Sequence, residues 1–185
     1  MMTPADNHAK GMVRLVIGVG NAYRSDDGVG IHVIRRLKEM NIAGLTLVES
    51  AGEGAALMAT WKGADAVILV DAVRSSGSPG LIHRLDAYDR NIPSDFFHYS
   101  THAFSVAEAV ELARALGELP SRFVIYGIEG VDFSAGTTLS PQVAHAADQV
   151  VRNVPGEWGD RVHRYTAKSY GTDFPVCQAF GDDLK

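Results

Sequence analysis

Apolar runs alternate with amphipathic stretches along most of this chain, and this alternation predicts strands that alternate with helices. Strands are expected at 13–19, 45–48, 66–72, 81–85 and 121–127, with the alternating run 81–85 at a sheet edge. Apolar residues at helical spacing predict helices at 29–40, 55–62, 104–116 and 141–153, the last with a capping Ser140 and Pro141 in its first position. This order predicts an α/β fold, a three-layer α/β/α sandwich around a mostly parallel twisted sheet of about five strands.

Length and composition favour one domain. The chain has 185 residues, of which 46% are apolar, enough for a single sizeable core. We assign residues 1–154 to one catalytic domain and expect 155–185, which has no hydrophobic period, to be a C-terminal extension with little structure of its own. The net charge of -5 argues against nucleic acid or an anionic membrane as partner. A polar N-terminus and the lack of a long apolar run predict a cytoplasmic protein without membrane attachment.

The turn after the first predicted strand carries two adjacent carboxylates. Gly18-Val19-Gly20 begins like the G-x-G-x-x-G loop that binds dinucleotides. Tyr23 stands where the third glycine belongs, however, and the charges of Asp26 and Asp27 would repel a diphosphate. The turn is therefore better suited to a cation, a water molecule or a peptide.

Other candidate ligands also follow predicted strands. Asp27, Glu49 and Asp71 each stand at a strand's carboxyl end, and His102 leads into the third predicted helix. Ligands bind outside the carboxyl ends of strands in sheets of this type, so these side chains are expected on one rim. Asp27, Asp71 and His102 form a plausible site for a divalent metal ion, with open positions for water or substrate. The expected supporting residues are Asn21, Asp26, Gly28, Gly30 and Glu49.

Each of these residues also has a simpler interpretation. Asp27 or Asp26 is compatible with a helix cap, and an isolated His102 with an ordinary loop histidine. Asp71 is harder to explain this way, because a carboxylate ending so apolar a strand needs a hydrogen bond or a ligand. Gly28 and Gly30 are expected to be small because a partner's peptide passes close to the turn.

The ordered set of motifs resembles the hydrogenase maturation endopeptidases, which trim the large subunit of nickel-iron hydrogenases. The resemblance covers about 13–154. It rests on Gly18-Val19-Gly20-Asn21, Arg24-Ser25-Asp26-Asp27-Gly28-Val29-Gly30, Val70-Asp71-Ala72-Val73, Ser100-Thr101-His102-Ala103-Phe104, Gly127-Ile128-Glu129 and Leu139-Ser140-Pro141. Many family members have an Asp-Gly-Gly-Thr loop where this chain reads Glu49-Ser50-Ala51-Gly52, so any role of that loop's first carboxylate passes to Glu49.

The resemblance implies a phosphorylase/hydrolase-like fold and an endopeptidase that removes the C-terminal peptide of the nickel-iron hydrogenase large-subunit precursor after nickel insertion. By position, Asp27, Asp71 and His102 correspond to the family's three nickel-binding side chains. The nickel would come from the precursor and serve as a recognition element, with no permanent cofactor. A metal-polarised carbonyl, a water activated by a carboxylate, or both would account for attack on the peptide bond.

Two alternatives remain open at this stage. The same three ligands suit a non-catalytic, nickel-dependent chaperone or checkpoint that holds the large subunit without cutting it. A peptidyl-tRNA hydrolase-like hydrolase also begins with a strand and a G-x-G-N turn, but the acidic pair Asp26-Asp27 and the acidic net charge oppose it.

Overall fold

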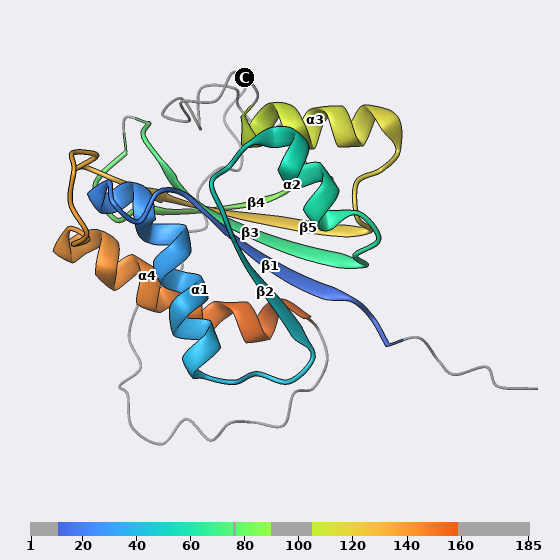
Figure 1. Ribbon diagram of the computed structural model, residues 1–185, viewed down its shortest axis with the longest axis horizontal. Helices are drawn as coiled ribbons and strands as arrows, with labels where there is room; N and C mark the ends of the chain where they lie inside the picture. The colour runs from blue at the N-terminus through green and yellow to red at the C-terminus, as the bar shows by residue number, and fades with distance from the viewer. Residues whose placement is uncertain (1–10, 76, 90–104, 159–185) are drawn as a thin grey trace, which may run out of the picture.

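The computed structural model describes residues 11–75, 77–89 and 105–158, which form a three-layer α/β/α sandwich (Figure 1). Its strands are β1 (Arg14–Val19), β2 (Leu45–Ser50), β3 (Ala66–Val73), β4 (Ile82–Asp86) and β5 (Arg122–Glu129). They form one sheet in the order β2-β1-β3-β5-β4, parallel except for the antiparallel pair β4 and β5. The predicted fold class is confirmed, including the place of the fourth strand at an edge.

Helices cover both faces of the sheet. They are α1 (Val29–Glu39), α2 (Gly54–Trp61), α3 (Val106–Leu116) and α4 (Pro141–Asn153), with short 3-10 turns η1 (Ser25–Gly28) and η2 (Val154–Trp158). Helices α1 and α4 pack together on one face, and α2 and α3 on the other (Figure 1). Every residue of β3 is buried, and its alternate side chains enter two cores, with Ile68 and Val70 toward α1 and α4 and Leu69 toward α2 and α3.

Two helix starts differ in detail from the sequence prediction. Helix α3 begins at Val106, two residues later than expected, because Ser105 and Glu108 form a capping box in which Ser105 N–H donates to Glu108 Oε2 at 2.7 Å. Helix α4 begins at Pro141 as predicted, but Ser140 makes no side-chain cap. Its hydroxyl donates instead to Asp26 Oδ2 at 2.8 Å, because that buried carboxylate needs donors.

The core of the domain continues past the boundary expected after residue 154. Trp158 packs in the core beside α4 and is only 7% exposed. Glu157 accepts hydrogen bonds from Arg84, Arg122 and Tyr126, which lie on β4 and β5. The bond from Arg84 is the main cause that lowers the pKa of Glu157 to about 2. The sequence placed this boundary too early because the residues that bind Glu157 lie far away in the chain. The rest of the predicted extension, 159–185, lies outside the described residues.

None of the helices in the described part of the chain is long and apolar enough to cross a membrane.

Candidate active site

The turn between β1 and α1 is packed tightly onto the sheet. Gly20 has a φ of +134°, and a Cβ there would lie 1.8 Å from the carbonyl oxygen of Asp27. A Cβ on Gly30 would lie 2.3 Å from the carbonyl oxygen of Val19 and 2.4 Å from that of Val70. The first turn of α1 therefore rests directly on the ends of β1 and β3. Packing within the chain, and not the passage of a partner's peptide, explains why Gly30 is small.

Asp26 joins this turn to the segment between β5 and α4. It is fully buried, and its carboxylate accepts hydrogen bonds from the N–H groups of Val131 (3.0 Å), Asp132 (2.9 Å) and Ser140 (2.7 Å), besides the Ser140 hydroxyl. Its own N–H donates to the carbonyl of Asp132 at 2.9 Å. The buried Asp26 therefore holds the turn after β1 against the segment between β5 and α4.

Asp27 and Asp71 lie together at the carboxyl ends of β1 and β3. Asp27 Oδ2 accepts a hydrogen bond from the N–H of Asn21 at 3.1 Å, and Asp71 Oδ1 from the N–H of Ala72 at 2.8 Å. Burial raises the pKa of both carboxyls. The charge of Asp27 raises the pKa of Asp71 further, so the two carboxylates repel each other. No salt bridge within the described ranges involves either one.

The other two residues expected on this rim behave differently. Glu49 forms ion pairs with α1, to Arg35 at 3.2 Å and to Lys38 at 2.8 Å, and these bonds lower its pKa. Its carboxylate is therefore engaged by cations of α1. His102 lies outside the described residues. Of the predicted rim residues, the structure thus brings together Asp27 and Asp71, and no group of three or more metal-ligating side chains is found among the residues described.

The segment between β5 and α4 lies beside the turn that carries Asp26 and Asp27, and the sequence did not predict this contact. Ser25 has a φ of 49°, unusual for a residue with a side chain, and its N–H donates to the carbonyl of Gly136 at 2.9 Å. The N–H of Gly136 donates in turn to the carbonyl of Tyr23 at 3.0 Å. The Leu139-Ser140-Pro141 motif predicted a helix start and contributed to the family resemblance, but it did not predict that Ser140 binds Asp26.

A polar cluster around one buried carboxylate also lies at the end of β5, beside the strand that carries Asp71. Glu129, 1% exposed, accepts hydrogen bonds from the N–H and hydroxyl of Ser75 and pairs with His83 Nε2 at 2.9 Å. Val73 of β3 is its register partner. Glu129 therefore fixes the turn that leaves β3. The Gly127-Ile128-Glu129 motif was the only sequence signal for this cluster, and no role had been assigned to it.

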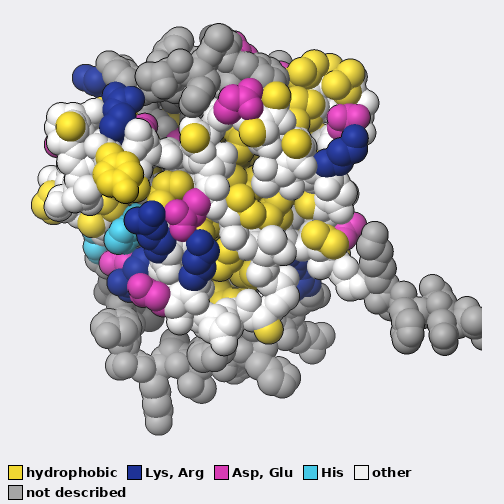
Figure 2. Space-filling model, in the orientation of Figure 1, with side chains coloured by type: hydrophobic (Ala, Val, Ile, Leu, Met, Phe, Trp, Pro, Cys, Tyr) yellow, Lys and Arg dark blue, Asp and Glu magenta, His cyan; other side chains and the backbone are white. Residues whose placement is uncertain are grey.

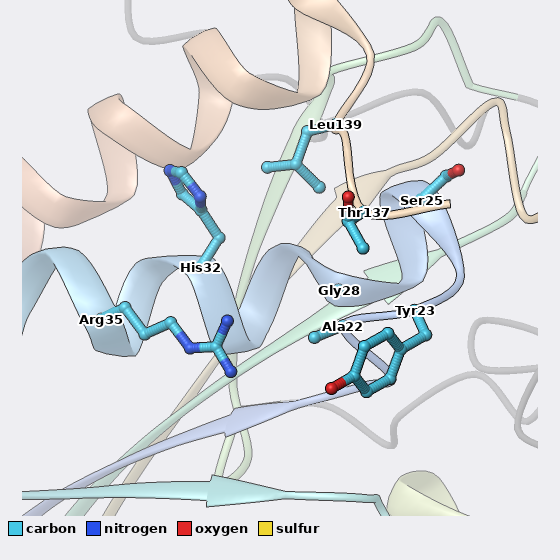
Figure 3. Close-up of a pocket in the computed structure, with 8 residues that line it drawn as sticks. All are labelled: Ala22, Tyr23, Ser25, Gly28, His32, Arg35, Thr137 and Leu139. Atoms are coloured by element: carbon cyan, nitrogen blue, oxygen red, sulfur yellow. The ribbon is translucent and has the colours of Figure 1, made fainter. Parts of the chain in front are cut away.

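A pocket opens beside the carboxylate turn. Its volume is about 150 Å³, and it is lined by Ala22, Tyr23, Ser25, Gly28, His32, Arg35, Thr137 and Leu139 (Figure 3). His32 and Leu139 lie on the side of α1 that faces α4, whereas Arg35 and Tyr23 lie toward β1 and β2 (Figure 3). Sites for whole small molecules usually measure about 300–1,000 Å³. This pocket is therefore of a size for one side chain of a larger partner.

The chain is similar to known proteins in both sequence and fold. A family model described as HycI, hydrogenase maturation protease, matches residues 31–157. The chain is 28% identical over 156 residues to the hydrogenase expression/formation protein HupD of Rhodobacter capsulatus, covering 80% of this chain and 73% of that protein. It is also 28% identical over 152 residues to a putative hydrogenase maturation protease of Methanocaldococcus jannaschii, covering 77% of this chain and 94% of that protein.

Solved structures show the same fold. The hydrogenase maturating endopeptidase HybD from Escherichia coli superposes with a TM-score of 0.63 at 18% identity, over 80% of this chain and 93% of that one. The hydrogenase maturation protease HycI from Thermococcus kodakarensis gives a TM-score of 0.60 at 22% identity, over 82% and 96% of the two chains.

Proposed function

The chain belongs to the hydrogenase maturation protease family, a family of hydrolases, and from that premise we propose that it removes the C-terminal peptide of a nickel-iron hydrogenase large-subunit precursor after nickel insertion. In this proposal the nickel arrives with the precursor, as part of the substrate, and marks it as ready for cutting. The protein itself carries no permanent cofactor.

The observation that carries the proposal is the pair of carboxylates at the ends of β1 and β3. Asp71 is only 7% exposed, and Asp27 is near enough for its charge to raise the pKa of Asp71. A divalent cation between them would remove both the repulsion and part of the cost of burying charge. Two carboxylate oxygens and the imidazole of His102 are donors that suit nickel, with positions left for a second set of ligands from the precursor.

Asp27 and Asp71 would then have two roles in the reaction. They recognise the metal that the precursor presents, and this places the peptide segment next to the rim. A carboxylate at this position is also a candidate base for the attacking water, with the metal available to polarise the peptide carbonyl. Asn21 and Asp26 hold the turn in shape through the hydrogen bonds described above.

The test is to incubate the protein with nickel-loaded and with nickel-free precursor and to follow the mass of the large subunit. We expect shortening of the loaded form only. If neither form is shortened, the proteolytic proposal fails, and stable binding of the loaded form without shortening would indicate a nickel-dependent chaperone instead. If both forms are cut equally, nickel is not the recognition element.

Variants locate the site. Asp27→Ala, Asp71→Ala and His102→Ala should each abolish nickel-dependent cutting while circular dichroism shows the fold unchanged. Asp65→Ala is the matched control, because Asp65 is an exposed carboxylate just before β3, at the opposite end of that strand from Asp71, and accepts a bond from the N–H of Val13. Full activity in the three site variants, or equal loss in the control, would contradict the assignment.

A further inference from the structure

Strand β2 forms one edge of the sheet (Figure 1). It pairs with β1 in an unbroken parallel register from Arg14 with Leu45 to Val19 with Ser50. In the part of the chain that the structure describes, no strand pairs with its other side. The outer side of β2 therefore presents a row of backbone donors and acceptors to whatever lies beyond it.

The register identifies which backbone groups point outward. The carbonyl of Ser50 accepts a hydrogen bond from the N–H of Gly20 at 3.0 Å, so Ser50 faces β1. In a parallel ladder the N–H and C=O of one residue point to the same side, and successive residues alternate. Thr46 and Val48 therefore also face β1, and the three remaining residues of the strand face outward: Leu45, Leu47 and Glu49.

Among the residues that the structure describes, β2 itself lacks two features that usually prevent strand addition. Such features include a proline, a bulge or an unpaired charge, and β2 has neither proline nor bulge. Its one charged side chain, Glu49, is neutralised by Arg35 and Lys38. Leu47 and Val48 are only partly buried. Figure 2 shows hydrophobic side chains gathered across the middle of this face, where β2 runs, with charged groups beside them.

The edge also leads to the candidate active site. Arg35 bonds to Glu49 near the end of β2 and lines the 150 Å³ pocket as well (Figure 3). Gly28, which lines the same pocket, follows Asp27 directly. The Glu49 end of β2 therefore lies next to the pocket, and the pocket lies next to the turn that carries Asp27.

We propose that β2 is the docking strand for the substrate: an extended segment of the hydrogenase precursor next to the cut adds to its outer edge, and one side chain beyond that segment enters the pocket. This inference rests on the proposed function. Exposed strand edges bind extended peptides, because backbone hydrogen bonds supply affinity without requiring a particular sequence. A protease in turn needs its target backbone held extended and accessible.

Sheet geometry places the cut relative to this strand. Neighbouring strands lie about 4.8 Å apart, so an added strand would run about 10 Å from β1, whose end carries the turn with Asp27. At about 3.3 Å per residue, roughly three residues bridge that gap. The paired segment should therefore end about three residues from the bond that is cut.

Hydrogen exchange at single amides of the full chain, with and without nickel-loaded precursor, tests the proposal. Precursor should slow exchange at least tenfold at Leu45, Leu47 and Glu49. Thr46, Val48 and Ser50 should change little, because β1 already protects them. Equal slowing at all six amides, or none at the outward three, would overturn the proposal. Slow exchange of the outward amides in the free protein would also overturn the proposal. It would mean that the edge is already covered by the protein's own chain or, if the slowing depends on protein concentration, by a second copy.

A pair of variants isolates the backbone contribution. Leu47→Pro removes an outward N–H while leaving the pairing with β1, and Leu47→Ala removes the same side-chain packing but keeps the N–H. We expect the proline variant to raise KM about tenfold over the alanine variant. Equal KM values would contradict edge pairing.

The two proposals fail separately. Cutting without alternating protection overturns edge docking alone. Alternating protection without cutting overturns proteolysis alone, and the absence of both overturns both.

Discussion

Replacing Asp26 and Asp27 in turn by asparagine separates a carboxylate that holds the fold from one that serves the reaction. The two residues are adjacent, and each change keeps the shape of the side chain while removing its charge. Asp26 has its carboxylate occupied by donors from the protein. Asp27 has one such donor among the described residues, the N–H of Asn21, and lies near the like charge of Asp71.

The magnitude for Asp26→Asn follows from its four hydrogen bonds. An asparagine offers one carbonyl oxygen in place of Oδ2, and its NH₂ group then faces the N–H of Ser140, which loses its acceptor. Hydrogen bonds to a charged group contribute about 1.5–3 kcal/mol each, and the three that remain weaken with loss of the charge. We expect the free energy of unfolding to fall by about 3–5 kcal/mol, a large part of the stability of a domain of this size.

Asp27→Asn should act in the opposite way. The pKa of Asp27 is raised mainly by burial, so at neutral pH its ionised form opposes folding, and an asparagine keeps the bond from Asn21 without the charge. We expect unchanged or higher stability together with loss of nickel-dependent cutting.

The assay is urea unfolding at neutral pH followed by circular dichroism, with cutting measured where each variant is fully folded. A change below about 1 kcal/mol in Asp26→Asn would refute the hydrogen-bond reasoning. A loss of stability in Asp27→Asn equal to that in Asp26→Asn would refute the separation of roles.

Gly30→Ala should destabilise the fold and weaken cutting, since its Cβ would lie 2.3 Å from the Val19 carbonyl oxygen and 2.4 Å from that of Val70; a melting temperature equal to wild type would contradict this. The pKa of Glu157 is lowered from 4.5 to about 2, so its contribution to stability is complete above pH 4.5 and is lost as the pH falls through about 2. The stability of Glu157→Gln, measured by acid titration, should not show that loss. A curve of stability against pH that runs parallel to wild type would contradict this role of Glu157. Burial and the charge of Asp27 raise the pKa of Asp71 well above 3.8, so cutting should decline on acidification while surface carboxylates remain ionised. A cutting rate that stays unchanged on acidification until the surface carboxylates are themselves protonated would count against this reasoning.

Much of the fold was predictable because strands and helices differ in the length and spacing of their apolar residues. The continuous run of β3 predicted a strand buried on both faces, and the alternation of β4 predicted an edge. The carboxyl ends of parallel strands share one edge of a sheet, and therefore the sequence alone predicts that Asp27 and Asp71 lie on the same edge. Burial and then the charge of Asp27 raise the pKa of Asp71, so the two carboxylates lie close enough to repel each other.

The direction in which a side chain turns at such an edge depends on residues distant in the chain, and only the tertiary structure decides it. Glu49 occupies the expected strand end, yet its carboxylate binds the cations that α1 brings alongside. Ser140 precedes a helix as a cap would, yet it serves Asp26, 114 positions earlier. Glu157 was assigned to an extension, yet it lies in the domain because Arg84 and Tyr126 stand on strands that η2 reaches only after folding. The local hydrophobic pattern therefore predicts the helices and strands of this protein. The packing of α1, α4 and η2 onto the sheet decides which polar side chains bind one another.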